Sequence, residues 1–421
     1  LPSRTLVVDP GAYTIKAGLV STDSDAPTPE CSVIPNCIAR ARTKHTYVGS
    51  ALSECTDFGE MQFKRPVERG YIVNWDLERA IFEHEFFEPK AKLYCDPSET
   101  ALLLSDPPNA PTALQSNADQ IIFEEFSFTA ATRLNNASLS AFTPLPLSLS
   151  TSPPPTEILL LIDAGHSSTT ITPVLRGSPI HPAIRRLTFG GKHLTNALAE
   201  SISLRHFSLI DEPHIVSQIK HDTSFVSASF SSDLDRAWPG PRSARRPVDP
   251  DVAVEYVLPD YTSLHRGYMR SRQPRSTTTT TAAGTRGEGE EESFPLANER
   301  FCPPELLFSP LDVGLHESGL PATVMQSLAA VPRALWGGLL ANIVLVGGTS
   351  LLPGFEERVE REVRALAPAE LVVRVARAES PIEASWRGGA GVAGRREWRD
   401  RVLVTRQQYE EYGEGWVRRE F

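Results

Sequence analysis

Two stretches of the chain share one pattern of hydrophobic and polar positions. LVVDPGAYTIKAGL (6–19) and ILLLIDAGHSSTTITPV (158–174) each run from apolar residues to an aspartate, a glycine turn and further apolar residues. An apolar run that ends in glycine and hydroxyl residues is typical of a buried strand followed by a tight turn. The pattern therefore predicts the same strand, turn and strand at two places in the chain.

Apolar residues three or four apart predict helices elsewhere. We expect a helix within 65–87 that is capped by Asn74 or Asp76, a helical region over 120–142, and a helix opened by a glycine turn over 189–202. A third strand and glycine turn, at 342–355, leads into a helix over 353–366, with Pro353 in its first turn.

Changes in composition suggest where domains begin and end. A segment rich in proline and serine, 143–157, interrupts the pattern just before its second copy and is a natural boundary. The segment 231–293 is basic and rich in proline at first, then of low complexity, then acidic, and we interpret it as a mobile insertion. Within it YVLPDYTSLHRGY (256–268) has aromatic and aliphatic residues and is expected to be ordered.

Composition excludes several classes of protein. The 421 residues are more than one hydrophobic core usually spans, and the net charge of −10 is a poor match for nucleic acid. The basic RSARR (242–246) could still contact DNA or an acidic surface, whereas GEGEEE (287–292) is interpreted as solvated linker. Five scattered cysteines favour a reducing compartment, and no apolar run is long enough to cross a membrane.

The three glycine turns, DPGAY, DAGHSST and GGTSLLPG, could bind an anion through backbone N–H groups. Two such turns facing each other would hold a polyphosphate, with Asp9 and Asp163 holding a hydrated Mg²⁺, and Gly347 and Gly348 would let the backbone approach a base or ribose. The alternative is that these residues only form tight turns and cap them in an empty cleft. His166 is interpreted as a polar filler rather than a general base, because no nucleophile pattern accompanies it.

These motifs resemble actin and the actin-related proteins over nearly the whole chain. DPGAYTIKAG and DAGHSST are similar to the family's two phosphate loops, and GYIVNWD, NERFCPPELLF, GGTSLLPGF and SWRGGAGVA follow in the family's order. The resemblance implies an α/β, two-lobed actin-like fold with duplicated RNase H-like cores around a nucleotide cleft. The first lobe would comprise 1–153 and 384–421, with a small subdomain at about 31–66, and the second 154–383.

Four further segments resemble one nuclear branch of the family: IPNC (34–37), 123–141, DEPHIVSQIK (211–220) and, above all, 256–268. That branch implies a non-catalytic docking subunit of a nuclear Swr-type (SRCAP-like) chromatin-remodelling complex, which exchanges a core histone for its Z-type variant. The implied partners are the remodeller ATPase subunit, a zinc-finger HIT subunit and, indirectly, the nucleosome. In the insertion, the expected docking residues are Tyr256, Leu258, Tyr261 and Tyr268.

The sequence departs from actin where chemistry would occur. Ala12 and Tyr13 stand where actin has a serine and a glycine, and His166 replaces an aspartate that helps organise Mg²⁺ and water. Asn136 replaces the water-positioning glutamine, and His221 a glutamate that contacts the ribose. The resemblance therefore implies a degenerate ATPase site with no catalytic residue, and leaves open whether ATP or ADP with Mg²⁺ is bound. The candidate nucleotide-binding residues are Asp9, Gly11, Ala12, Tyr13, Lys16, Asp163, Gly165, His166, Gly191, Lys220, Gly347 and Gly348.

Two other functions stay open at this point: a weak ATPase of the actin and sugar-kinase superfamily, and a cytoskeletal or dynactin-type actin relative. The segment that corresponds to actin's subunit-joining loop, 39–50, is short and basic. Because filaments need the same two surfaces on every subunit, we expect a monomer that docks into a larger assembly.

Overall fold

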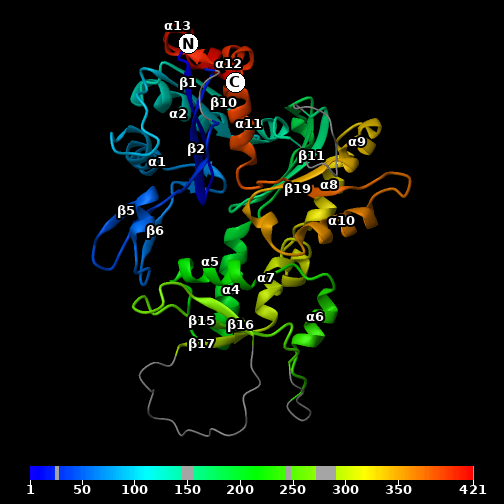
Figure 1. Ribbon diagram of the computed structural model, residues 1–421. Helices are drawn as coiled ribbons and strands as arrows, with labels where there is room; N and C mark the ends of the chain where they lie inside the picture. Colours follow the sequence, from blue (N-terminus) through cyan, green and yellow to red (C-terminus); the bar gives the residue numbers. More distant parts are fainter. Residues whose placement is uncertain (24–27, 145–155, 242–247, 272–290, 421) are drawn as a thin grey trace.

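The computed structural model describes residues 1–23, 28–144, 156–241, 248–271 and 291–420, and these form two α/β halves side by side (Figure 1). The predicted linker at 143–157 and the basic segment 242–246 fall mostly or wholly outside the described residues, as does most of GEGEEE. Among the described residues, no helix has the length and apolar character needed to cross a membrane.

The first half is built on a six-stranded sheet in the order β20-β10-β9-β1-β2-β3. Its first two strands form an antiparallel hairpin, and β9 and β10 continue the sheet in parallel with β1. The strands are β1 (Arg4–Pro10), β2 (Thr14–Ser21), β3 (Ser32–Pro35), β9 (Thr100–Asp106), β10 (Ala130–Asn135) and β20 (Val404–Thr405).

The second half repeats this topology in the order β13-β12-β11-β18-β19, with β14 also paired to β12. An antiparallel hairpin is again followed by two parallel strands. The strands are β11 (Ile158–Ala164), β12 (Thr169–Leu175), β13 (Ser178–Pro179), β14 (Arg185–Leu187), β18 (Ile343–Val346) and β19 (Val375–Arg377). The predicted duplication of strand, turn and strand is therefore confirmed, and the third predicted strand is β18.

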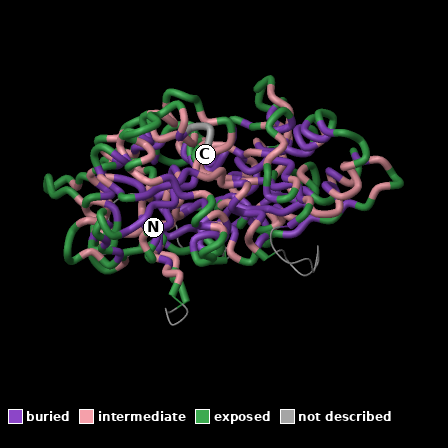
Figure 2. Tube along the Cα trace, turned by 90° about the horizontal axis from the view of Figure 1, so that it is seen from above, coloured by how far each residue is buried: buried purple, intermediate pink, exposed green. Residues whose placement is uncertain are grey.

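Helices α3 (Asn136–Ala141) and α11 (Ala384–Ala393) lie between the two sheets. Leu139 and Trp386 pack with Val7 of the first sheet, whereas Ala137 and Ala384 pack with the second. Figure 2 shows the buried segments running through the interior of both halves, with exposed residues gathered in the peripheral loops. The two helices therefore join the halves through apolar contacts.

Other helices cover the opposite faces of the sheets. Helix α1 (Trp75–Phe82), which is capped by the Asn74 side chain as predicted, and the π-helical turns Glu83–Phe87 and Ile121–Glu125 cover the first sheet. Helices α8 (Leu320–Ala329) and α10 (Phe355–Leu366) cover the second. The remaining helices are α2 (Thr112–Gln120), α4 (Gly191–Arg205), α5 (Pro213–Thr223), α6 (Phe230–Ala237), α7 (Cys302–Glu305), α9 (Trp336–Ala341), α12 (Arg396–Val402), α13 (Arg406–Tyr412) and α14 (Glu414–Glu420).

Each half carries a small sheet. In the first half it consists of β4 (Ile38–Arg40), β5 (Thr46–Val48) and β6 (Gln62–Lys64), with the pair β7 (Val67–Glu68) and β8 (Tyr71–Ile72) close behind in the chain. In the second it consists of β15 (Val254–Val257), β16 (Tyr268–Ser271) and β17 (Ser293–Leu296), which pack on α4 and α5. Part of the predicted insertion is therefore ordered, including the segment 256–268.

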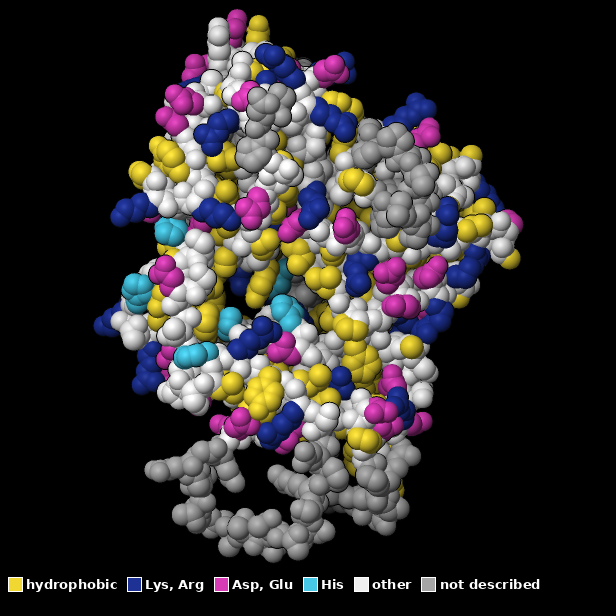
Figure 3. Space-filling view, in the orientation of Figure 1, with side chains coloured by type: hydrophobic (Ala, Val, Ile, Leu, Met, Phe, Trp, Pro, Cys, Tyr) yellow, Lys and Arg dark blue, Asp and Glu magenta, His cyan; other side chains and the backbone are white. Residues whose placement is uncertain are grey.

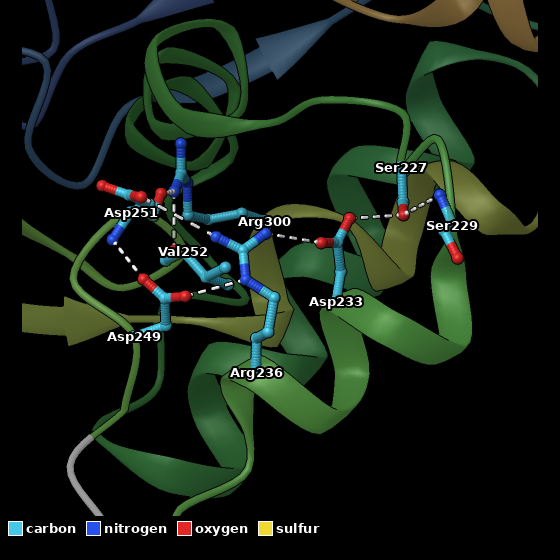
Figure 4. A network of polar contacts seen from close by, with 8 residues as sticks. All are labelled: Ser227, Ser229, Asp233, Arg236, Asp249, Asp251, Val252 and Arg300. Atoms are coloured by element: carbon cyan, nitrogen blue, oxygen red, sulfur yellow. Dashed lines mark hydrogen bonds and ion pairs between the residues drawn. The ribbon is translucent and has the colours of Figure 1, made fainter.

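Salt bridges anchor the described parts of the insertion around the break at 242–247. Arg236, in the last turn of α6, donates to Asp233 and to Asp249, at 3.1 and 2.8 Å, so it joins the two sides of the break (Figure 4). Arg300 donates to the backbone carbonyl of Val252 at 2.6 Å. These contacts hold the described residues before and after 242–247 against the second half.

Two sequence predictions about helices are corrected. The predicted helical region over 120–142 contains strand β10, because its residues Ala130–Asn135 pair with β9 in the centre of a sheet that local periodicity does not reveal. Pro353 precedes its helix, since Gly354 is the N-cap of α10.

Candidate nucleotide cleft

A cavity of about 570 Å³ lies between the two halves, at the ends of the central strands. The space-filling view shows a hollow in the middle of one face, with histidine and hydrophobic side chains around it (Figure 3). All twelve candidate nucleotide-binding residues line the cavity, as do Asn136 and His221. They come together because both duplicated hairpins turn at the edge of their sheets that faces the other half.

The two aspartates occupy equivalent positions in the two hairpins. Asp9 pairs in register with Lys16, whose ammonium lies 3.5 Å from the Asp9 carboxylate, and it also accepts a hydrogen bond from Ser105. Asp163 pairs in register with Thr170 and accepts a hydrogen bond from Asn136 at 3.2 Å. Lys16 is therefore ion-paired with Asp9, whereas the hydrogen-bond donor to Asp163 is a neutral amide.

Burial, and then the negative charge of Asp9, raise the pKa of Asp163 to about 6. A divalent cation between the two carboxylates would offset both effects, so this pair suits Mg²⁺ in part. Among the described residues, however, no group of three or more acidic, histidine or cysteine side chains is arranged to hold a metal. A cation here would depend on water or a ligand for the rest of its coordination.

Two aromatic side chains, one from each glycine turn, meet in the space between the turns. The rings of Tyr13 and His166, one from each turn, contact each other with centroids 4.9 Å apart. The guanidinium of Arg65 lies 4.5 Å from the centre of the Tyr13 ring, and the Tyr13 hydroxyl is 3.5 Å from that of Ser217 on α5. A polyphosphate held from both sides by the turns would need this space, so the residues present do not fit a triphosphate.

His166 carries no positive charge in this setting. Burial, and then the positive charges of Arg65 and Lys220, lower its pKa to about 3. The imidazole is therefore neutral at physiological pH and contributes no charge toward a phosphate.

Lys220 and Gly347 also line the cleft. Lys220 donates to the Gly191 carbonyl at 3.0 Å and to the Thr195 hydroxyl at 2.8 Å, and burial lowers its pKa to about 8. Gly347 has a φ of +85°, and a Cβ there would overlap the backbone of Ala164. This third turn therefore needs glycine to lie directly against the end of β11.

The predicted docking residues differ in their accessibility. Tyr256 is fully buried in the core formed by α4, α5 and the small sheet, so the prediction that it contacts a partner is wrong. Side chains alternate between the two faces of β15, and that of Tyr256 lies on the buried face. Its hydroxyl donates to Asp222 at 3.2 Å. Leu258 and Tyr261 are partly buried against the same core, and only Tyr268, on edge strand β16, is exposed.

Sequence reasoning did not find Ser105 and Ser217, which line the cleft, or Arg65, which lies against Tyr13. They act on residues of the predicted turns from distant parts of the chain, and no local motif marks them. For Arg65 the position just after β6, between the small sheet and the cleft, is a feature of the tertiary structure alone.

The duplicated sheets, the facing glycine turns and the cleft between them define a two-lobed α/β protein of the actin type. The family model for actin matches residues 1–421, and the chain belongs to the actin family. It is similar to proteins named Actin-related protein 6: 45% identical to the one from Neurospora crassa, covering 100% of this chain and 94% of that relative. The relatives of that name from Drosophila melanogaster and Arabidopsis thaliana are 34% and 31% identical, covering 98% and 100% of this chain and 98% and 99% of theirs.

Proposed function

We propose that this chain is a non-catalytic subunit of a nuclear ATP-dependent chromatin-remodelling complex, where it serves as a docking scaffold for exchange of a core histone for its Z-type variant. The observation that carries the non-catalytic part is the Tyr13–His166 contact in the space between the turns. Similarity over the full chain to relatives named Actin-related protein 6 supports the choice of assembly, together with the motifs of the nuclear branch.

The proposed partners are the remodeller ATPase subunit and a zinc-finger HIT subunit, with the nucleosome contacted indirectly and DNA only weakly. Edge strand β16 offers the exposed side chains Tyr268 and Met269 for such contacts. Among the described residues β16 pairs only with β15, so its other edge offers backbone groups for pairing.

Affinity purification of the tagged chain from nuclear extract tests the assembly. We expect the remodeller ATPase and the zinc-finger subunit to be recovered, and a Tyr268→Ala, Met269→Ala variant to recover severalfold less of at least one of them. The matched control is Leu366→Ala, an exposed apolar residue on α10, which should recover both normally. Recovery of dynactin components in place of chromatin proteins would favour the cytoskeletal alternative.

A weak ATPase is the second candidate, because Asp9, Asp163 and Lys16 still line the cleft. The Asn136 side chain is hydrogen-bonded to Asp163, and the rings of Tyr13 and His166 meet between the two turns. We therefore expect the purified chain to release phosphate no faster than an Asp163→Ala variant. Steady release that disappears in the variant would show that the chain is an enzyme.

A further inference from the structure

The two halves contact each other directly at the mouth of the cleft, apart from the helices that join them. The ring of Phe58, which precedes β6, stacks on His214 in the first turn of α5, with centroids 4.0 Å apart and planes 5° apart. Phe63 on β6 lies nearly parallel to the same imidazole at 6.1 Å. Beside them the backbone N–H of Glu60 donates to the Glu212 carboxylate at 3.0 Å.

Further contacts cross the cleft at its other edges. The guanidinium of Arg186, in the second half, lies 5.2 Å from the centre of the Tyr71 ring and donates to the backbone carbonyl of Arg69, both in the first half. His181 of the second half lies 3.1 Å from the Asn109 side chain of the first. Together with Tyr13–His166 and Phe58–His214, these are called the cross-cleft contacts below.

The side chains in these contacts attract each other strongly enough to help keep the two halves in contact. His214 is a neutral aromatic ring, because burial and the nearby Arg65 lower its pKa to about 4. Stacked and tilted aromatic pairs, and a guanidinium over a ring, add attraction beyond the apolar area that they bury. Each pair has one member in each half, so every pair would be broken if the cleft opened.

We propose that the cross-cleft contacts, rather than a bound nucleotide, hold the two halves of this protein closed, and that the Tyr13–His166 pair excludes a nucleoside triphosphate from the space between the turns. The inference concerns the isolated chain, so it holds or fails independently of the complex in which the chain works. In a protein held closed by a ligand, stability rises with ligand concentration, whereas closure by side chains is independent of it.

The first test is thermal unfolding of the chain after bound nucleotide has been stripped and its removal checked by ion-exchange chromatography. We expect millimolar ATP or ADP with Mg²⁺ to raise the melting temperature by less than about 1 °C, because little nucleotide would bind. We also expect X-ray scattering to give the same radius of gyration before and after stripping. A rise of several degrees with ATP, or expansion on stripping, would overturn the proposal.

The second test opens the mouth of the cleft in the nucleotide-free chain. Phe58→Ala should raise amide hydrogen exchange at least tenfold in β6 and in α5, since the stack on His214 is lost. Tyr94→Ala, which removes an exposed aromatic side chain of the same half, is the matched control and should leave exchange in both segments unchanged. Equal exchange in wild type and Phe58→Ala would contradict the proposed role of the stack.

The third test asks whether the rings exclude the triphosphate. In a Tyr13→Gly, His166→Gly variant, ATP with Mg²⁺ should raise the melting temperature by more than it does in wild type, because the space between the turns is then free. No gain in the folded variant would contradict exclusion by these rings. If the variant does not fold, calorimetric titration of stripped wild type with ATP decides: no detectable binding supports exclusion, and saturable binding contradicts it.

Discussion

Glu78 on helix α1 is a single residue whose burial costs free energy that the sequence alone does not reveal. Its side chain is fully buried, and neither carboxyl oxygen has a hydrogen-bond partner among the described residues. Burial raises the pKa of Glu78 to about 8, although the nearby Asn36 amide slightly favours the charged form. The carboxyl group is therefore mostly protonated at neutral pH.

This shift has a defined consequence for stability. The pKa of Glu78 is higher in the folded than in the unfolded chain. The free energy of unfolding is therefore highest below pH 4.5, where Glu78 is protonated in both states, and it falls as the pH rises through about 8. Glu78→Gln cannot ionise, so at pH 8 it should be more stable than wild type by about 4 kcal/mol, and nearly equal to it at pH 4.5. Urea unfolding at both pH values measures the difference. The exposed Glu83→Gln should change stability by less than about 0.5 kcal/mol at either pH, and a similar result for Glu78→Gln would contradict the argument.

At the scale of elements, the contact between α3 and α11 determines how closely the two halves approach. Gly388 on α11 faces the backbone of α3, and a Cβ there would overlap the carbonyl of Leu139. Its neighbour in the same helix, Gly391, is exposed, and a Cβ there would have only the Phe142 carbonyl, at 4.0 Å, within reach. A substitution at Gly388 therefore tests the close packing of the two helices, whereas the same substitution at Gly391 tests only intrinsic helix propensity.

We expect Gly388→Ala to destabilise the protein by about 2–3 kcal/mol or more, because the helices must move apart. Gly391→Ala should be neutral or stabilise by up to about 1 kcal/mol, since alanine is the better helix former. Chemical denaturation of both variants measures the two effects. Equal effects would show that the helices adjust freely at this contact. If Gly388→Ala yields no folded protein while Gly391→Ala does, the direction of the prediction holds.

At the scale of the whole molecule, two surface features lead us to expect that the chain does not form head-to-tail filaments. The strands β4 and β5 are joined by only five residues, 41–45, and the predicted insertion contributes the small sheet β15–β17 to the surface of the second half. An open filament needs two complementary surfaces on every copy, and changes at both should prevent it. The chain is therefore expected to stay monomeric by itself.

Sedimentation velocity at high protein concentration with Mg²⁺ tests this expectation. We expect a single species with a mass near that of one chain, 46.2 kDa. Filaments that pellet at high speed would contradict it, and a discrete dimer would point instead to an interface between two copies.

Much of the fold could be predicted from the sequence, because duplicated strands, glycine turns and helix caps are local patterns. The repeats at β1–β2 and β11–β12, the Asn74 cap and the helices α4 and α10 all follow from residues close together in the chain. Strand β10 could not be predicted in this way, since its apolar residues suit a helix or a strand equally and the neighbouring strand β9 decided between them.

The sequence by itself determined that two glycine turns with aspartates exist, that their neighbours Tyr13 and His166 depart from the family pattern, and that an aromatic segment lies in the insertion. Only the tertiary structure decided that the two rings meet, that Phe58 stacks on His214 and that Tyr256 is buried. The physical reason is that turns and strands depend on neighbours in the chain. Contacts between two halves depend instead on how separately folded surfaces come together, and no local pattern records that.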